Sequence, residues 1–171
     1  LLSYTERDDV GITGARLLYE DNTVQHAGVV IGYNGLAGHT FVGNEPDDVG
    51  YHAYVIQARD YSAVTAACLM VKASLYDEVG GFEEELEVAF NDVDFCLKVR
   101  EKGYLVVYNP YAVLHHYESK SRGYEDTPEK RNRFEKEAFF TYNKWEKILA
   151  DGDPCYNPNL TLSNSDFSLR E

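Results

Sequence analysis

Cysteine is scarce in this sequence, and its three copies are too scattered to form a metal cluster. Cys68, Cys96 and Cys155 include no pair at the Cys-x-x-Cys spacing that structural zinc sites use. Cys68 lies in an apolar run and Cys96 in an amphipathic segment, so both are predicted to be small buried side chains. Nothing indicates a disulfide framework, so a reducing compartment fits best and we expect a cytoplasmic protein.

Positive charge and long apolar runs are also in short supply. Sixteen Lys and Arg stand against 29 Asp and Glu, which gives a formal charge of −13. Such a surface repels nucleic-acid phosphates, so a nucleic-acid partner is disfavoured. No apolar run approaches the roughly 18 residues that a membrane-spanning helix requires. Any membrane association of the full-length protein is therefore expected to be peripheral, at the inner face.

The sequence has enough apolar residues to form a core. Its 171 residues, 44% of them hydrophobic, suit one compact domain. Segments with strand character alternate with helical ones, which predicts an α/β fold. The expected strands cover residues 10–19, 24–32, 63–71, 104–108 and 111–116, and the expected helices cover 74–79, 91–102 and a long segment from Thr127 onward. A polar stretch, residues 153–171, is expected at the surface.

Two of these segments are the most informative. Residues 63–71 run nearly without polar side chains, which is typical of a strand covered on both faces. Residues 91–102 form the clearest helix, with Asn91 as the expected N-cap and a buried face that begins at Val93.

The chain does not begin with Met, and its opening residues are typical of a helix already under way. We therefore expect an excised fragment.

A series of short motifs carries a resemblance to a known family. In chain order they are Gln25-His26-Ala27-Gly28, Gly80-Gly81-Phe82-Glu83-Glu84, Asn91-Asp92-Val93-Asp94, Gly103-Tyr104 and the run from His116 to Gly123. Their order and spacing resemble the second half of inverting glycosyltransferases of family 2, in particular rhamnosyltransferase-like members. The resemblance covers roughly residues 10–149. It implies the C-terminal portion of a GT-A fold, with a mixed β-sheet flanked by helices.

The resemblance also implies a domain plan and an activity. Residues 1–150 would form the acceptor-side half of a GT-A domain and residues 151–171 a C-terminal tail. The Asp-x-Asp motif that follows an apolar strand in relatives does not occur here, so the nucleotide-binding half is expected upstream and the isolated chain is expected to be inactive. The full-length enzyme would transfer a sugar from a nucleotide-diphosphate sugar, such as dTDP-rhamnose, to a glycan or lipid-linked acceptor in polysaccharide synthesis.

Asp92 is the expected catalytic base. In the family, the second acid of an acidic pair deprotonates the acceptor hydroxyl, and in this sequence the pair reads Asn91-Asp92. The first turn of a helix at a cleft edge can hold a carboxylate within hydrogen-bond reach of a sugar hydroxyl. The helix dipole favours a carboxylate at this position in any case, so a purely structural Asp92 remains the alternative.

His116 is the expected metal ligand. Adjacent residues of a strand point to opposite faces, so only one of His115 and His116 should reach a cleft. The resemblance assigns His116 to a divalent cation, Mn²⁺ or Mg²⁺, that would neutralise the departing nucleotide diphosphate. The alternative is a hydrogen-bonded structural histidine.

Six further residues are expected to contact substrate, and each has a structural alternative. The six are Asn91, Asp94, Gly80, Gly81, Thr65 and Arg122. Gly80 and Gly81 would allow the backbone to approach a sugar closely or would simply end a helix, and Arg122 would clamp a diphosphate or remain solvated. Asp94 could instead form a structural hydrogen bond, and Thr65 could pack in the core. His26 and His39 are interpreted as structural or surface residues.

Two other classes of function stay open. One is a non-catalytic carbohydrate-binding or scaffold module that keeps the fold without the nucleotide-binding half. The other is a metal-dependent hydrolase that uses Asp92, Asp94 and His116, whose ligands would have to converge within this chain. An exposed sheet edge would also allow a homodimer.

Overall fold

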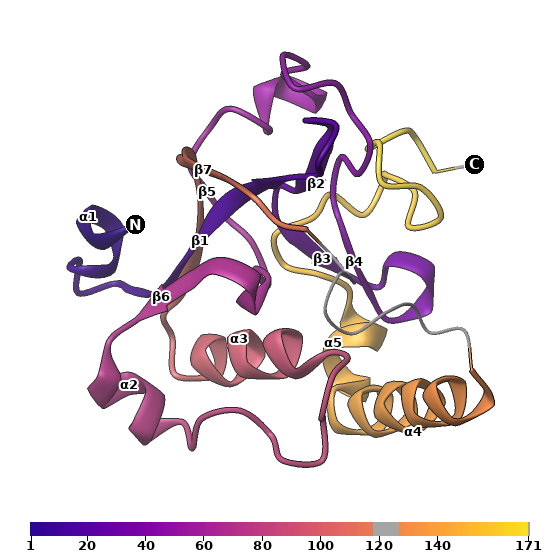
Figure 1. Cartoon of the computed structure of the whole chain (residues 1–171). Helices are drawn as coiled ribbons and strands as arrows, with labels where there is room; N and C mark the ends of the chain where they lie inside the picture. Colours follow the sequence, from indigo (N-terminus) through magenta and orange to yellow (C-terminus); the bar gives the residue numbers. More distant parts are fainter. Residues whose placement is uncertain (118–126, 171) are drawn as a thin grey trace.

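The computed structural model describes residues 1–117 and 127–170, which form a mixed α/β fold (Figure 1). Its larger sheet has the strand order β2-β1-β7-β5, and a fifth strand, β6, also pairs with β1. The pairing of β1 with β7 is parallel and the other pairings are antiparallel. The strands are β1 (Val10–Leu18), β2 (Val24–His26), β5 (Arg59–Asp60), β6 (Leu69–Val71) and β7 (Leu105–His115). The predicted α/β class with a mixed sheet and flanking helices is confirmed.

A second, two-stranded sheet and five α-helices complete the described part of the chain. The small sheet pairs β3 (Val29–Ile31) with β4 (Ala37–His39). The helices are α1 (Leu2–Thr5), α2 (Ala73–Glu78), α3 (Asn91–Glu101), α4 (Pro128–Lys144) and α5 (Glu146–Asp151), with 3₁₀ turns η1 (Tyr33–Gly35), η2 (Tyr51–Ala53) and η3 (Ala66–Cys68). Figure 1 shows α2, α3 and α4 along one side of the sheet. Among the described residues, no helix is long and apolar enough to cross a membrane.

The core lies between β1 and α3. All nine residues of β1 are buried, and α3 directs five apolar side chains inward between Val93 and Val99. The predicted helix is confirmed, but Asn91 is not its N-cap. The preceding residue, Phe90, takes that position with a φ of 61°, and no side chain caps the helix. Asp92 consequently lies in the first helical turn, where its carboxylate accepts hydrogen bonds from the Ala66 and Val93 N–H groups.

The single strand predicted for residues 24–32 is wrong, because the chain turns at Gly28. There φ is +109°, and a Cβ atom would lie 2.4 Å from the Tyr61 ring. β2 therefore joins the large sheet and β3 the small one. Only glycine combines this backbone conformation with so close an approach to an aromatic ring.

The apolar run 63–71 is also not one buried strand. Residues up to Thr65 are buried, but Ala66 and Ala67 are exposed and only Leu69–Val71 pair as β6. The Thr65 hydroxyl accepts a hydrogen bond from the Ala67 N–H at 3.3 Å, which starts the η3 turn. Cys68 is therefore half-exposed, whereas Cys96 is buried as predicted.

The two strands predicted for residues 104–116 form one strand, β7. Its pairing with β1 jumps from Ala15↔Asn109 to Arg16↔Val113, so three residues loop out between them. One of the three is Pro110, which lacks the N–H that a regular ladder needs. The loop keeps both halves of β7 in the sheet, and His116, which directly follows β7, lies within hydrogen-bond distance of Gln25 on β2.

The stretch expected as a surface tail packs into the fold instead. Residues 153–170 run beside β3 and β4 (Figure 1, yellow), and Tyr156, Leu160 and Phe167 are buried in the core. The Phe167 ring stacks on Phe41 with centroids 4.7 Å apart. The buried Asp153 carboxylate accepts hydrogen bonds from the Ser62 hydroxyl at 2.6 Å and from the Ile31 N–H at 2.7 Å. This stretch therefore belongs to the same packing unit as the sheets.

We predict that Gly28→Ala destabilises the fold by roughly 2–5 kcal/mol, because overpacking a core typically costs about 1–3 kcal/mol and a positive φ adds about 1–2 kcal/mol. Gly35→Ala is the matched control, since its φ is +88° but nothing lies within 4 Å of the added Cβ. It should cost only about 1–2 kcal/mol. Urea unfolding of both variants measures the difference, and equal losses would contradict the contact with Tyr61.

Candidate active site

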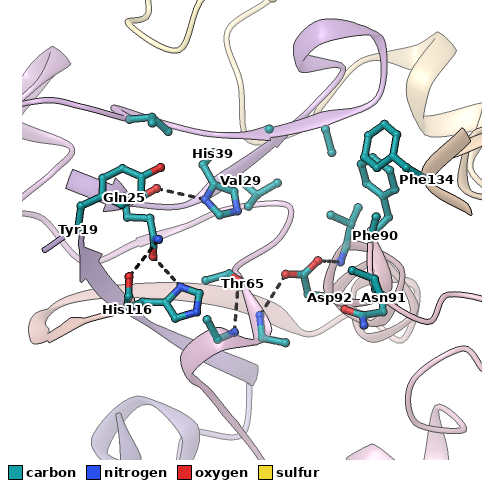
Figure 2. Close-up of a pocket in the computed structure, with 18 residues that line it drawn as sticks. Tyr19, Gln25, Val29, His39, Thr65, Phe90, Asn91, Asp92, His116 and Phe134 are labelled. Carbon is teal, nitrogen blue, oxygen red and sulfur yellow. Dashed lines mark hydrogen bonds between the residues drawn. The ribbon is translucent and has the colours of Figure 1, made fainter. Parts of the chain in front are cut away.

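A cleft of about 650 Å³ opens where the two sheets meet the N-terminus of α3. Four of the residues predicted to act on substrate or metal line it: Thr65, Asn91, Asp92 and His116. Figure 2 shows Asp92 and Asn91 on one side and His116 on the other, with Thr65 between them. The fold thus brings together residues that lie up to 51 positions apart in the sequence.

Asp92 is held from two sides. One carboxylate oxygen accepts a hydrogen bond from the Ala66 N–H at 3.1 Å, and the other accepts one from the Val93 N–H at 2.9 Å. Each ionised carboxylate oxygen can accept two hydrogen bonds, so each keeps capacity for a ligand. The side chain is half-buried at the cleft wall. Its geometry therefore fits a fixed proton acceptor.

His116 is oriented by Gln25, which sequence reasoning did not single out. The His116 Nδ1 lies 2.8 Å from the Gln25 Oε1, and the Gln25 amide donates back to the His116 carbonyl at 3.3 Å. An amide oxygen only accepts hydrogen bonds, so Nδ1 carries the imidazole proton and Nε2 keeps its lone pair. His115 points elsewhere, with its Nε2 2.8 Å from the exposed Asn22. The arrangement leaves His116 ready to bind a metal or accept a hydrogen bond.

His39 is a second cleft histidine that was interpreted as structural. Its Nδ1 lies 3.2 Å from the backbone carbonyl of Gln25, which again places the proton on Nδ1 and leaves Nε2 as an acceptor. His26 lies behind it, fully buried, with ring centroids 4.7 Å apart. Burial, reinforced by His39, lowers the pKa of His26 well below its usual 6.5, so His26 is neutral. His26 is structural as interpreted, whereas His39 belongs to the site.

Asp94 does not fit the substrate-binding role expected for it. Its side chain has no exposed surface and accepts a hydrogen bond from the Trp145 indole at 2.9 Å. Lys144 and Lys98 approach the same carboxylate at 2.8 and 3.3 Å. Asp92 and Asp94 lie two residues apart on a helix and therefore point in different directions. Asp94 joins α3 to the end of α4, which is its structural alternative.

The glycine pair does not line the described cleft. Gly80 and Gly81 follow α2 with φ of +81° and +64°, and neither lines the cleft. Their backbone conformations suit the end of a helix, the structural alternative for this pair. Arg122 lies outside the described residues, so its expected contact with a diphosphate stays a prediction.

Helix α4 contributes Phe134 to one wall of the cleft, and its Glu137 binds the loop that leads into that wall; sequence reasoning missed both roles. The buried Glu137 carboxylate accepts hydrogen bonds from three successive backbone N–H groups, those of residues 87, 88 and 89, at 3.1, 3.2 and 2.7 Å. The next residue, Phe90, contacts Phe134 with ring centroids 5.5 Å apart. Glu137 lies among charged residues of α4 such as Glu135 and Lys136, so its local sequence gave no signal, and its partners lie about 50 residues away.

The hydrolase alternative lacks its ligand set. Asp94 is buried on the side of α3 that contacts Trp145, and it does not line the cleft that contains Asp92 and His116. Within residues 1–117 and 127–170, no three His, Cys, Asp or Glu side chains gather in a way that could hold a metal ion. A cation at His116 would therefore need further ligands beyond these side chains, such as substrate oxygens.

Comparison with known proteins relates the whole chain to much longer relatives. No family model matches it. The chain is 49% identical over 170 residues to the uncharacterised protein y4gI of Sinorhizobium fredii. It is 36% identical over 172 residues to the O-antigen biosynthesis protein RfbC of Myxococcus xanthus. Each match covers 99% of this chain but only 19% and 13% of the relative, so the chain spans less than a fifth of their length.

A shorter similarity adds a named activity in a relative. Over 60 residues the chain is 35% identical to an N-acetylglucosaminyl-diphospho-decaprenol L-rhamnosyltransferase of Mycobacterium tuberculosis. This match covers 35% of the chain and 20% of that enzyme. Relatives connected with glycan synthesis thus match this chain both over its full length and locally.

We predict that Gln25→Leu changes the tautomer of His116 but not that of His39. The variant removes the amide oxygen beside His116, whereas His39 is bound by the Gln25 backbone carbonyl, which remains. Long-range ¹H–¹⁵N NMR spectra of the imidazole rings identify which nitrogen carries the proton. In the wild type both rings should carry it on Nδ1, and a His116 signal unchanged in the variant would contradict the assigned role of Gln25.

Proposed function

We propose that the gene product carrying this chain is a glycosyltransferase of family 2 that transfers a sugar from a nucleotide-diphosphate sugar to a hydroxyl acceptor, with inversion, in polysaccharide or cell-surface glycan synthesis. One observation carries the proposal. The cleft presents a fixed carboxylate, Asp92, across from an imidazole lone pair, His116, with Thr65 between them (Figure 2).

The relatives support the same direction. RfbC is named for O-antigen biosynthesis, and the mycobacterial relative is named as a rhamnosyltransferase acting on a lipid-linked sugar. Both names describe glycan assembly, in which a sugar hydroxyl is the nucleophile. A chain related to such proteins, with a carboxylate in a cleft of about 650 Å³, fits a transferase better than a hydrolase whose third ligand is buried.

The proposed reaction is a single in-line displacement. The acceptor hydroxyl attacks the anomeric carbon of the donor while its proton passes to the Asp92 carboxylate. The bond from that carbon to the nucleotide diphosphate breaks on the opposite side, so the configuration inverts. The two backbone N–H groups that bind Asp92 hold it in one orientation, which fixes the direction of proton transfer.

A divalent cation is proposed for the leaving-group side of the cleft. The His116 Nε2 would be its protein ligand within this chain, because Gln25 holds the imidazole in the tautomer that metals require. Bound there, the cation would neutralise charge on the departing diphosphate. Imidazole favours Mn²⁺ over Mg²⁺, which prefers oxygen ligands.

The remaining expectations stay predictions. They comprise the division into an acceptor-side half (residues 1–150) and a tail, a nucleotide-binding half upstream, a cytoplasmic location with peripheral membrane association, and a homodimer. A non-catalytic carbohydrate-binding module remains the alternative if the chain binds sugar without turnover.

Asp92→Asn should reduce transferase turnover by roughly 10²-fold or more, because the amide cannot accept the acceptor proton. Release of nucleotide diphosphate from dTDP-rhamnose and a panel of other nucleotide sugars measures the rate on the gene product that carries this chain. Asp77→Asn is the control, since Asp77 is exposed on α2 and lies outside the cleft. Unchanged turnover in a folded Asp92→Asn protein would rule out the assigned base.

Metal dependence gives a separate prediction. EDTA should abolish turnover, Mn²⁺ should restore it, and His116→Ala should raise the Mn²⁺ concentration for half-maximal activity by about tenfold or more. His115→Ala is a matched control, because His115 is adjacent to His116 in sequence but its imidazole contacts Asn22 and does not line the cleft. Full turnover in EDTA, or equal effects of the two substitutions, would count against the cation.

A further inference from the structure

The cleft has two chemically different walls. One wall carries His39, His116 and Gln25, and the opposite wall carries Asn91 and Asp92 together with two phenylalanines (Figure 2). These are Phe90, just before α3, and Phe134 on α4, with ring planes tilted by 45°. The Phe134 side chain is 41% exposed. A large, partly exposed apolar ring therefore lines the same wall of the cleft as a carboxylate and a carboxamide.

The aromatic wall is held firmly in place. Phe134 and Glu137 are three residues apart on α4 and therefore lie on the same helix face. Glu137 binds the three backbone N–H groups that immediately precede Phe90. Phe90 itself has a left-handed backbone, φ 61° and ψ 5°, which a bulky residue adopts only where its surroundings enforce it. Such enforced conformations concentrate at ligand sites.

The chemistry of this wall matches a pyranose ring. A sugar has an apolar C–H face that can lie on an aromatic ring and a rim of hydroxyls that can bind Asp92 and Asn91. An aliphatic chain would displace water from the carboxylate and the carboxamide without offering either a replacement hydrogen bond, which is costly. A nucleotide would bring phosphate charge toward Asp92 in a protein whose formal charge is already −13.

We propose that Phe134 and Phe90 form the platform of the acceptor subsite, on which the sugar ring that receives the transferred residue stacks, with its reactive hydroxyl directed at Asp92. The identification of the bound sugar as the acceptor rests on the proposed function, but the predicted contact between sugar and aromatic ring does not require turnover. The donor would then lie toward the His116 wall, so the two substrates approach from opposite sides of the cleft.

Binding of simple sugars to this chain tests the platform directly. The probes are methyl β-D-glucopyranoside, methyl β-D-galactopyranoside and methyl α-L-rhamnopyranoside, observed by saturation-transfer NMR with irradiation of the protein aromatic protons. At least one probe should receive saturation on the C–H protons of a single ring face. Phe134→Leu should weaken its binding by about two- to tenfold, and Phe134→Tyr should preserve it.

Phe139→Leu is the matched control for these variants. Phe139 belongs to the same helix and is 70% exposed, but it lies outside the cleft, so its substitution should leave binding unchanged. Thermal unfolding of each variant establishes that it is folded. The platform is overturned if no probe binds the wild type up to molar concentration, or if Phe134→Leu and Phe139→Leu bind equally well.

Kinetics on the gene product separate this inference from the proposed function. Phe134→Leu should raise the KM for the acceptor by a similar two- to tenfold and leave the KM for the nucleotide sugar unchanged. Turnover with an unchanged acceptor KM would overturn the platform while keeping the transferase. Face-selective sugar binding without any turnover would support the platform and remove the transferase.

Discussion

The hydrogen bonds from three successive backbone N–H groups to the Glu137 carboxylate are the interaction on which the cleft depends. They attach the loop at residues 87–89 to α4, and that loop leads through Phe90 into α3. A carboxylate buried to 97% is favourable only where several donors replace its lost water, and here the backbone supplies them. Because Asp92 lies in the first turn of α3, its position is a consequence of this attachment. Asp153 performs a similar task for residues 153–170, where the Ser62 hydroxyl and the Ile31 and Cys155 N–H groups surround it.

These two carboxylates give a structural meaning to part of the acidic composition. The chain carries 29 Asp and Glu, and a sequence count cannot show which of them are solvated. Asp94, Glu137 and Asp153 are buried and tie loops or helices to the core. Asp92 is the acid of this kind that also borders open space. Among the described residues that line the cleft, Asp92 is therefore the one carboxylate, and it lies on the aromatic side.

Local patterns were sufficient for the elements whose partners are near in sequence. β1 and α3 follow from their own apolar spacing, and the order of the motifs alone predicts Asp92 and His116 as site residues. The sequence was not sufficient where a distant contact decides. Gly28 breaks a strand because of the Tyr61 ring 33 residues away. The η3 turn has a local cause, the hydrogen bond from the Ala67 N–H to the Thr65 hydroxyl, which the apolar run did not reveal. Gln25, His39 and Phe134 acquire their places in the cleft only through tertiary contacts, and Asp94 is hidden by Trp145 from 51 residues along the chain.

The double role of Gln25 has a consequence for how the histidine wall assembles. Its side chain holds one imidazole and its backbone carbonyl holds the other, so both rings take their orientation from a single residue of a three-residue strand. A slip of β2 by one position would turn that side chain to the other face of the sheet and break the hydrogen bonds that hold both imidazole rings. The two histidines are therefore oriented together or not at all, and the correct register of one three-residue strand determines which.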